Sequence, residues 1–118
     1  MKKVLVVDDE ESIRELYRAE LADEGYDVGL AADGREAVRL LEAFGPDLVT
    51  LDIMMPGVDG IETLRRIREK NPTIPVVLVS AFSEFKQDFN TWASEAYIVK
   101  SHDTTELKET VRRLLGGG

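Results

Sequence analysis

Apolar residues along this chain fall into two kinds of pattern that alternate from beginning to end. Five short apolar runs read as buried strands, and they cover residues 4–7, 26–32, 48–51, 75–79 and 97–99. Between and after them, apolar residues recur at helical spacing, at 13–21, 37–44, 61–67, 85–92 and 107–115. The run at 26–32 is the weakest of the strand patterns. The alternation predicts five β-α units.

Strands that alternate with helices over short loops form a parallel sheet with right-handed crossovers. Helices then cover both faces of that sheet, so the pattern predicts a doubly wound α/β fold with five parallel strands. The 118 residues suit one domain with a sizeable core. We expect this domain to span residues 1–115. The glycines at 116–118 then either end the last helix or begin a tether.

Turn and capping signals divide the predicted elements. Gly25 suits the position after a helix C-terminus, and Gly45-Pro46 stops the second helix. Three acidic segments resemble helix N-caps followed by a glutamate: these are 33–36, 59–62 and 103–106.

Charge and composition exclude several classes of protein. The net charge is −8, which argues against a nucleic-acid-binding surface on this chain. The sequence has no cysteine, and therefore no disulfide framework or thiolate metal site. No apolar run approaches membrane-spanning length, and Asp8-Asp9 interrupt the N-terminal one too early for a signal peptide. A cytoplasmic protein is expected.

Polar residues that could form a functional site stand at the carboxyl ends of the predicted strands. Parallel α/β sheets bind their ligands at these ends. They are Asp8 and Asp9 after the first strand, Asp52 after the third, Ser80 after the fourth and Lys100 after the fifth. Clustered carboxylates repel one another, and a hard divalent cation such as Mg²⁺ relieves that repulsion. With a lysine and a hydroxyl beside them, they make a site for a phosphoryl group.

Four segments, in this order, resemble the signature blocks of the response-regulator receiver domain: VVDDE at 6–10, LDIMMPGVDG at 51–60, VSA at 79–81 and YIVK at 97–100. The resemblance spans essentially the whole chain. It implies a flavodoxin-like fold with strand order 2-1-3-4-5. It also implies a two-component signalling switch rather than an enzyme that turns over a substrate.

The resemblance further assigns roles to individual residues. Asp52 would accept the phosphoryl group from a phosphohistidine of a sensor kinase or phosphotransfer protein. Asp9, Asp52 and the backbone carbonyl of Met54 would bind Mg²⁺ (or Mn²⁺), with Asp8 acting through water. Lys100 would pair with the phosphoryl oxygens. Ser80 and Tyr97 would act as the switch toward a downstream target or fused effector.

The sequence departs from the family at three places. Ser101 follows Lys100 where most members have a cis proline, so this bond is expected to be trans or strained. The segment from Ser80 to Lys100 is shorter than usual. Met54 and Phe82 stand where many relatives have polar residues. Since neither side chain binds water well, we expect them to obstruct the water that hydrolyses the aspartyl phosphate.

Simpler explanations exist for single residues. Asp8-Asp9 suit an ordinary helix start, Lys100 a solvated surface position and Ser80 a strand end. Tyr97 suits a half-buried strand aromatic. The aromatic residues at 85, 89 and 92 suit the core, and His102 the surface.

Three other functions compete with the signalling switch. A haloacid-dehalogenase-type phosphatase needs an aspartate where this chain has Met54. A flavodoxin-like cofactor carrier needs a phosphate-binding loop where this chain has acidic residues 8–11. An interaction module that is never phosphorylated stays open, although the site residues are all present.

Overall fold

The structure is a computed structural model, which describes residues 1–53, 59–81 and 95–116. Five strands are present, namely β1 (Lys3–Val7), β2 (Asp27–Ala31), β3 (Leu48–Asp52), β4 (Val76–Ser80) and β5 (Ala96–Val99). The described helices are α1 (Glu11–Asp23), α2 (Gly34–Ala43), α3 (Asp59–Lys70) and α5 (Thr105–Leu115). The helix expected around 85–92 lies outside the described residues.

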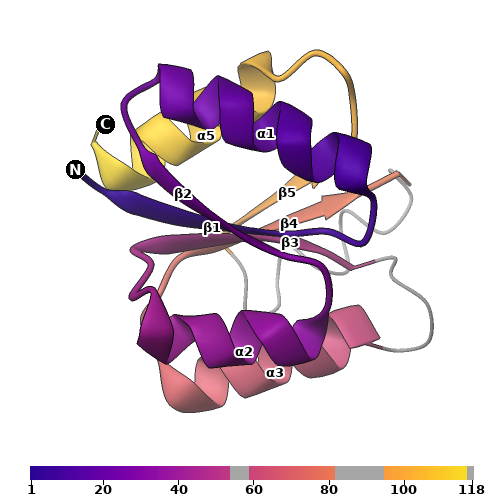
Figure 1. Ribbon diagram of the computed structural model, residues 1–118, viewed down its shortest axis with the longest axis vertical. Coiled ribbons are helices and arrows are strands. Elements are labelled where there is room, and N and C mark those ends of the chain that lie inside the picture. The colour runs from indigo at the N-terminus through magenta and orange to yellow at the C-terminus, as the bar shows by residue number, and fades with distance from the viewer. Residues whose placement is uncertain (54–58, 82–94, 117–118) are drawn as a thin grey trace.

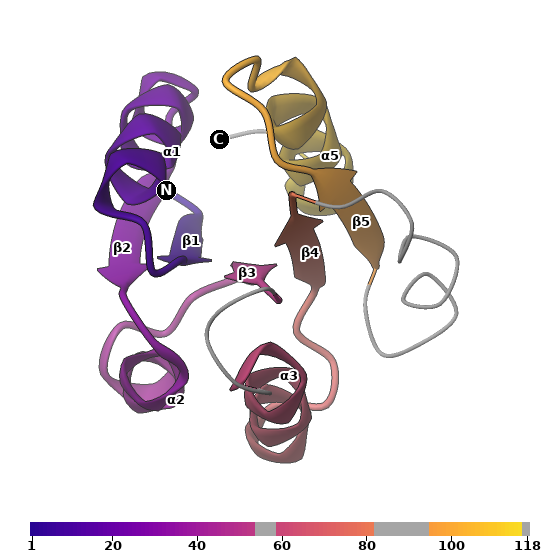
Figure 2. The same cartoon turned by 90° about the vertical axis from the view of Figure 1, so that its right-hand side faces the viewer.

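The strands form one parallel sheet in the order β2-β1-β3-β4-β5. Helices α1 and α5 cover one face of this sheet, and α2 and α3 cover the other (Figure 1, Figure 2). The carboxyl ends of all five strands meet at one edge, on the right in Figure 1. The predicted doubly wound, flavodoxin-like fold is therefore confirmed.

The sheet separates two apolar clusters because neighbouring residues of a strand point to opposite faces. Leu5, Val49 and Leu78 belong to the cluster beneath α2 and α3. The cluster beneath α1 and α5 includes Val4 and Val77, one residue away from Leu5 and Leu78 respectively. All five residues of β3 are buried, as are those of β4, which explains why most residues of both strands are apolar. Strand β2 lies at the edge of the sheet and is mostly half-exposed, which explains its weak pattern.

The helix ends follow the predicted signals in part. After α1, Gly25 has φ 96°, and the N–H of Tyr26 donates to the Leu21 carbonyl at 3.2 Å, which is a Schellman ending. At α2, the Asp33 side chain accepts the N–H of Glu36 at 2.9 Å. The prediction of an Asp59 cap with a reciprocating glutamate was wrong: α3 begins at Asp59 itself, and Glu62 binds arginines of its own helix.

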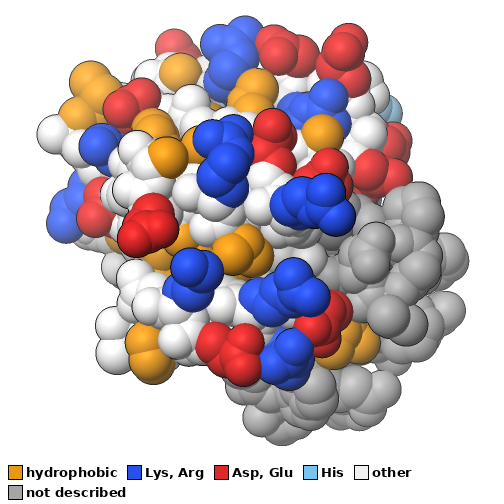
Figure 3. Space-filling model, turned by 60° about the horizontal axis from the view of Figure 1, so that its bottom comes forward, with side chains coloured by type: hydrophobic (Ala, Val, Ile, Leu, Met, Phe, Trp, Pro, Cys, Tyr) orange, Lys and Arg blue, Asp and Glu red, His pale blue; other side chains and the backbone are white. Residues whose placement is uncertain are grey.

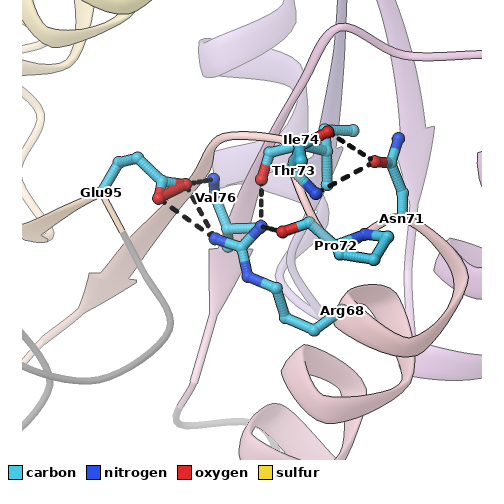
Figure 4. Close-up of polar contacts among 7 residues, drawn as sticks. All are labelled: Arg68, Asn71, Pro72, Thr73, Ile74, Val76 and Glu95. Atoms are coloured by element: carbon cyan, nitrogen blue, oxygen red, sulfur yellow. Dashed lines mark hydrogen bonds and ion pairs between the residues drawn. The ribbon is translucent and has the colours of Figure 1, made fainter.

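A polar cluster joins three segments at the amino edge of the sheet, opposite the carboxyl ends (Figure 4). Arg68 of α3 donates to the backbone carbonyl of Ile74 and pairs with the Glu95 carboxylate at 2.7 Å. Glu95 also accepts the N–H of Val76 at 2.8 Å, and its own N–H donates to the Val76 carbonyl at 2.9 Å. We call these four residues the Arg68–Glu95 cluster. It ties the end of α3 to the beginnings of β4 and β5.

Charged side chains of both signs alternate over α2 and α3. Figure 3, in which this side comes forward, shows basic and acidic groups next to one another. Within α3, Arg65 pairs with both Glu62 and Glu69, and Arg66 pairs with Glu62. This mixed surface does not resemble the basic face of a nucleic-acid-binding protein. Among the described residues, no helix is long and apolar enough to cross a membrane.

Candidate functional site

The site lies at the carboxyl edge of the three central strands and β5. Asp52 is the last residue of β3, Asp8 directly follows β1, and Lys100 directly follows β5. The Lys100 N–H donates to the Ser80 carbonyl at 2.6 Å, which fixes the end of β5 against the end of β4. Residues more than 90 positions apart in the chain thereby come into contact, as the strand-end argument predicted.

The Lys100 ammonium is the centre of this site. Its Nζ lies 3.1 Å from Asp8 Oδ2, 3.1 Å from Asp52 Oδ2 and 2.8 Å from Glu10 Oε1. The side chains of Lys100, Asp8 and Asp52 are only 11%, 3% and 2% exposed, so this is not a solvated surface lysine. The simpler explanation of Lys100 as a surface residue is therefore wrong.

Four carboxylates surround the position that a cation would occupy. One oxygen each from Asp8, Asp9, Glu10 and Asp52 lies within 4.8 Å of the others. Asp8 and Asp52 are buried, whereas Asp9 and Glu10 are exposed. Hard carboxylate oxygens with an open, solvent-facing side suit Mg²⁺, which keeps part of its water shell when it binds to proteins. The residues present therefore fit this ion.

Burial and like charge leave this cluster electrostatically strained. Burial raises the pKa of Asp8 to about 6, and the neighbouring Asp52 charge contributes in the same direction. Burial alone would lower the pKa of Lys100, but its hydrogen bonds to Glu10, Asp8 and Asp52 outweigh that effect and raise it. The bond from Lys100 lowers the pKa of Glu10. A second positive charge at this site would relieve the strain.

Hydrogen bonds to the backbone and side chain of Asp8 hold this residue in place. The guanidinium of Arg14 on α1 donates to the Asp8 carbonyl at 2.7 Å, and the Glu10 N–H donates to Asp8 Oδ1 at 2.9 Å. The Asp8 N–H donates to the Ala31 carbonyl of β2 at 3.1 Å. Sequence reasoning missed Arg14 and Glu10 as site residues. Their place in and just after the acidic segment 8–11 is the only sequence signal that points to them.

Glycine at position 60 lets α3 begin close to the end of β3. A Cβ atom at Gly60 would lie 2.4 Å from the Cα of Ile53, which is the residue after Asp52. No side chain fits at that distance. The glycine therefore determines how closely α3 approaches the strand end that presents Asp52.

The structure also gives the positions of some of the other residues named from the sequence. Ser80 is fully buried at the end of β4, and Tyr97 is buried in the cluster beneath α2 and α3. His102 is exposed, as expected. The Lys100–Ser101 peptide bond is trans, since no described bond is cis. Met54, Phe82 and the aromatic residues at 85, 89 and 92 lie outside the described residues.

Comparison with known proteins identifies the family. The response regulator receiver domain family matches residues 4–112. The chain belongs to this family. A receiver domain is a signalling switch of two-component phosphorelays rather than a classical enzyme, which removes the phosphatase and cofactor-carrier alternatives.

The curated relatives of this receiver domain include longer transcriptional regulators. It is 38% identical over 115 residues to the transcriptional regulatory protein TrcR of Mycobacterium tuberculosis, covering 96% of this chain and 45% of TrcR. The same identity relates it to the transcriptional regulator PhoP of Bacillus subtilis, covering 97% of this chain and 48% of PhoP. The chain thus spans about half the length of these curated relatives.

Solved structures include relatives of matching length. The response regulator TrrA of Thermotoga maritima, in complex with Mg²⁺–BeF, is 45% identical with a TM-score of 0.86, and covers 98% of this chain and 100% of that one. TrrA in complex with the histidine kinase ThkA superposes with a TM-score of 0.87 at the same identity, covering 98% and 99%.

Proposed function

We propose that Asp52 is the phosphoacceptor of this receiver domain. The observation that carries the proposal is the buried ion pair between Asp52 and Lys100 inside a cluster of four carboxylates. A buried carboxylate next to a fixed cation, at the strand edge where α/β folds bind ligands, is placed for phosphoryl chemistry.

The proposed reaction is transfer from a phosphohistidine. An Asp52 carboxylate oxygen forms a bond to phosphorus while the phosphorus–nitrogen bond breaks, and the electron pair stays on the imidazole nitrogen of the donor. Lys100 pairs with the phosphoryl oxygens. Catalysis of such a transfer is mostly positioning and charge stabilisation. The bonds that Arg14 and Glu10 make to Asp8 serve the positioning.

The proposed metal ligands are Asp9, Asp52 and the Met54 carbonyl, with Asp8 acting through water. The compact carboxylate cluster and the raised pKa of Asp8 support a Mg²⁺ site here. The Mg²⁺–BeF complex of the relative TrrA also supports it. Bound Mg²⁺ supplies charge neutralisation for the phosphoryl oxygens.

The partner and the output follow from the relatives. We infer that a sensor histidine kinase, or a phosphotransfer protein, donates the phosphoryl group, a proposal that the TrrA–ThkA complex supports. Ser80 and Tyr97 would respond to the phosphoryl group and alter a surface read by a downstream protein or a fused effector. Residues 1–115 would form the receiver unit and 116–118 a glycine tail or the start of a linker, with the protein acting in the cytoplasm. Direct nucleic-acid binding by this unit is not part of the proposal.

The phosphorylated state is proposed to decay slowly. Met54 and Phe82 take the positions beside the approach of the hydrolytic water in this family. Neither side chain is a good hydrogen-bond partner for that water. A long-lived aspartyl phosphate would suit an output that outlasts its stimulus.

The experiment is incubation with Mg²⁺ and acetyl phosphate, followed by intact-mass measurement and peptide mapping. Wild type should gain one phosphoryl group on the peptide that contains Asp52. Asp52→Ala should gain none, whereas the control Asp23→Asn, at an exposed position of α1, should behave as wild type. An unmodified wild type, or modification that persists in Asp52→Ala, would refute the assignment.

A further inference from the structure

Every N–H of the Lys100 ammonium already has a carboxylate opposite it. An ammonium has three donors, and Lys100 Nζ has three partners, Asp8, Glu10 and Asp52, at 2.8–3.1 Å. Lys100 therefore has no spare donor for a phosphoryl oxygen. To act on a phosphoryl group, it must first give up one of these partners.

The three partners differ in how easily they release Lys100. Asp8 and Asp52 are almost completely buried, and a buried carboxylate that loses its cation is left with a large desolvation cost. The Glu10 side chain is 56% exposed, so it can turn into water at little cost. Its backbone stays in place, because its N–H is bound to Asp8 Oδ1. Glu10 is the partner that leaves most easily.

The geometry points to Glu10 as a positioning residue, and we propose that it holds Lys100 before phosphorylation and releases it to the incoming phosphoryl group. This inference rests on the proposed function, since it assumes that Lys100 acts on that group. Glu10 and the phosphoryl oxygens then compete for one N–H of Lys100. Loss of the Glu10 contact should make the protein bind a phosphoryl group more readily.

Two variants of Glu10 separate the effect of its side-chain length from the effect of its charge, and a third variant serves as the control. Glu10→Asp keeps the negative charge but shortens the side chain by one methylene, so the contact with Lys100 is lost. Glu10→Gln keeps the length but replaces an ion pair with a weaker neutral hydrogen bond. Glu11→Gln is the matched control, because Glu11 is the next residue, is exposed, and makes no ion pair within the described part of the chain.

The first measurement is the Kd of beryllium fluoride in excess Mg²⁺, by calorimetry. Because an exposed ion pair contributes little free energy, we expect Glu10→Asp and Glu10→Gln to bind about threefold more tightly than wild type. Glu11→Gln should bind like wild type. The second measurement is the ¹⁵N resonance of the Lys100 ammonium without metal. It should shift in both Glu10 variants and stay unchanged in Glu11→Gln.

The possible outcomes are distinct. Wild-type affinity in Glu10→Asp overturns the inference, because it would mean that charge alone matters and the contact does not. An unchanged Lys100 resonance in both Glu10 variants overturns it as well. If wild type itself does not bind beryllium fluoride, the proposed function fails, and the inference fails with it. A wild type that binds, with Glu10 variants that bind no better, refutes only the inference.

Discussion

At the amino edge of the sheet, the Arg68 guanidinium faces one carboxylate and backbone carbonyls, whereas at the carboxyl edge the Lys100 ammonium faces three carboxylates. Among the described residues, the first cluster pairs one positive charge with one negative charge. In the second, negative charge is in excess, and two of the carboxylates are buried. Such an excess costs stability in the unphosphorylated, metal-free protein. The same fold thus uses one edge to stabilise its strands, and carries at the other the acidic cluster that we propose binds a cation and a phosphoryl group.

The largest expected effect on the free energy of unfolding concerns Asp8, and it tests the difference between the two edges of the sheet. Its pKa of about 6 exceeds the ordinary 3.8, so the folded protein binds a proton more tightly than the unfolded chain. Stability is therefore lost as the pH rises from about 4 to 6, by up to about 3 kcal/mol. Asp8→Asn should remove this loss, so that in EDTA it unfolds at higher urea than wild type at neutral pH but not near pH 4.

An exposed carboxylate far from the site, Asp23 on α1, provides the control. Asp23→Asn should keep the wild-type dependence of unfolding on pH. If the dependence of Asp8→Asn between pH 4 and 7 matches that of wild type, the carboxyl edge does not carry the electrostatic cost assigned to it.

The next largest effect concerns the Arg68–Glu95 cluster. Arg68→Ala and Glu95→Ala should each reduce the free energy of unfolding by about 2 kcal/mol, because each breaks a mostly buried ion pair and a side-chain hydrogen bond to the backbone. The double variant should lose little more than either single one. Urea unfolding measures these losses.

Arg65→Ala is the matched control for the arginine. Arg65 lies on the same helix, and its ion pairs with Glu62 and Glu69 are exposed. Its removal should cost much less. Equal losses for Arg65→Ala and Arg68→Ala would show that the amino edge has no special stabilising role.

A smaller effect concerns apolar residues proposed to act at the carboxyl edge. Replacing Met54 with Asn and Phe82 with Glu should admit water and speed loss of the phosphoryl group about tenfold, equivalent to ~1.4 kcal/mol of barrier. The measurement follows the phosphorylated mass over time in Mg²⁺, with no kinase or phosphatase. A double variant that decays no faster than wild type would mean that these side chains do not control water access.

The smallest effect concerns Asp9, which is exposed. Asp9→Ala should stabilise the metal-free protein by up to about 1 kcal/mol, because it removes one of the repelling charges. It should also reduce the stabilisation that Mg²⁺ gives, since a proposed ligand is lost. Thermal unfolding with and without Mg²⁺ measures both. Equal stabilisation of wild type and Asp9→Ala by Mg²⁺ would exclude Asp9 as a ligand.

The helix-end signals show when the local sequence is sufficient to predict a cap and when it is not. Gly25 and Asp33 act at the predicted helix ends because their effect depends on the backbone within a few residues. Glu62 failed as a capping residue because two arginines on its own helix compete for the same carboxylate. A capping pattern alone does not say which partner a side chain chooses.

The sequence by itself determined the five strands, the alternation with helices, and the positions of Asp8, Asp52 and Lys100 at strand ends. Hydrophobic periodicity is a local property, and the carboxyl ends of parallel strands share one edge in any strand order. The order β2-β1-β3-β4-β5 came from family resemblance rather than from periodicity.

Only the tertiary structure decided which charges meet. Glu10 reaches Lys100 across 90 positions of sequence, and Arg68 reaches Glu95 across 27. Both contacts depend on which strands are neighbours and on how far a long side chain extends from its backbone. Neither quantity is present in the pattern of apolar and polar residues, because that pattern says which face a residue lies on but not what lies opposite it.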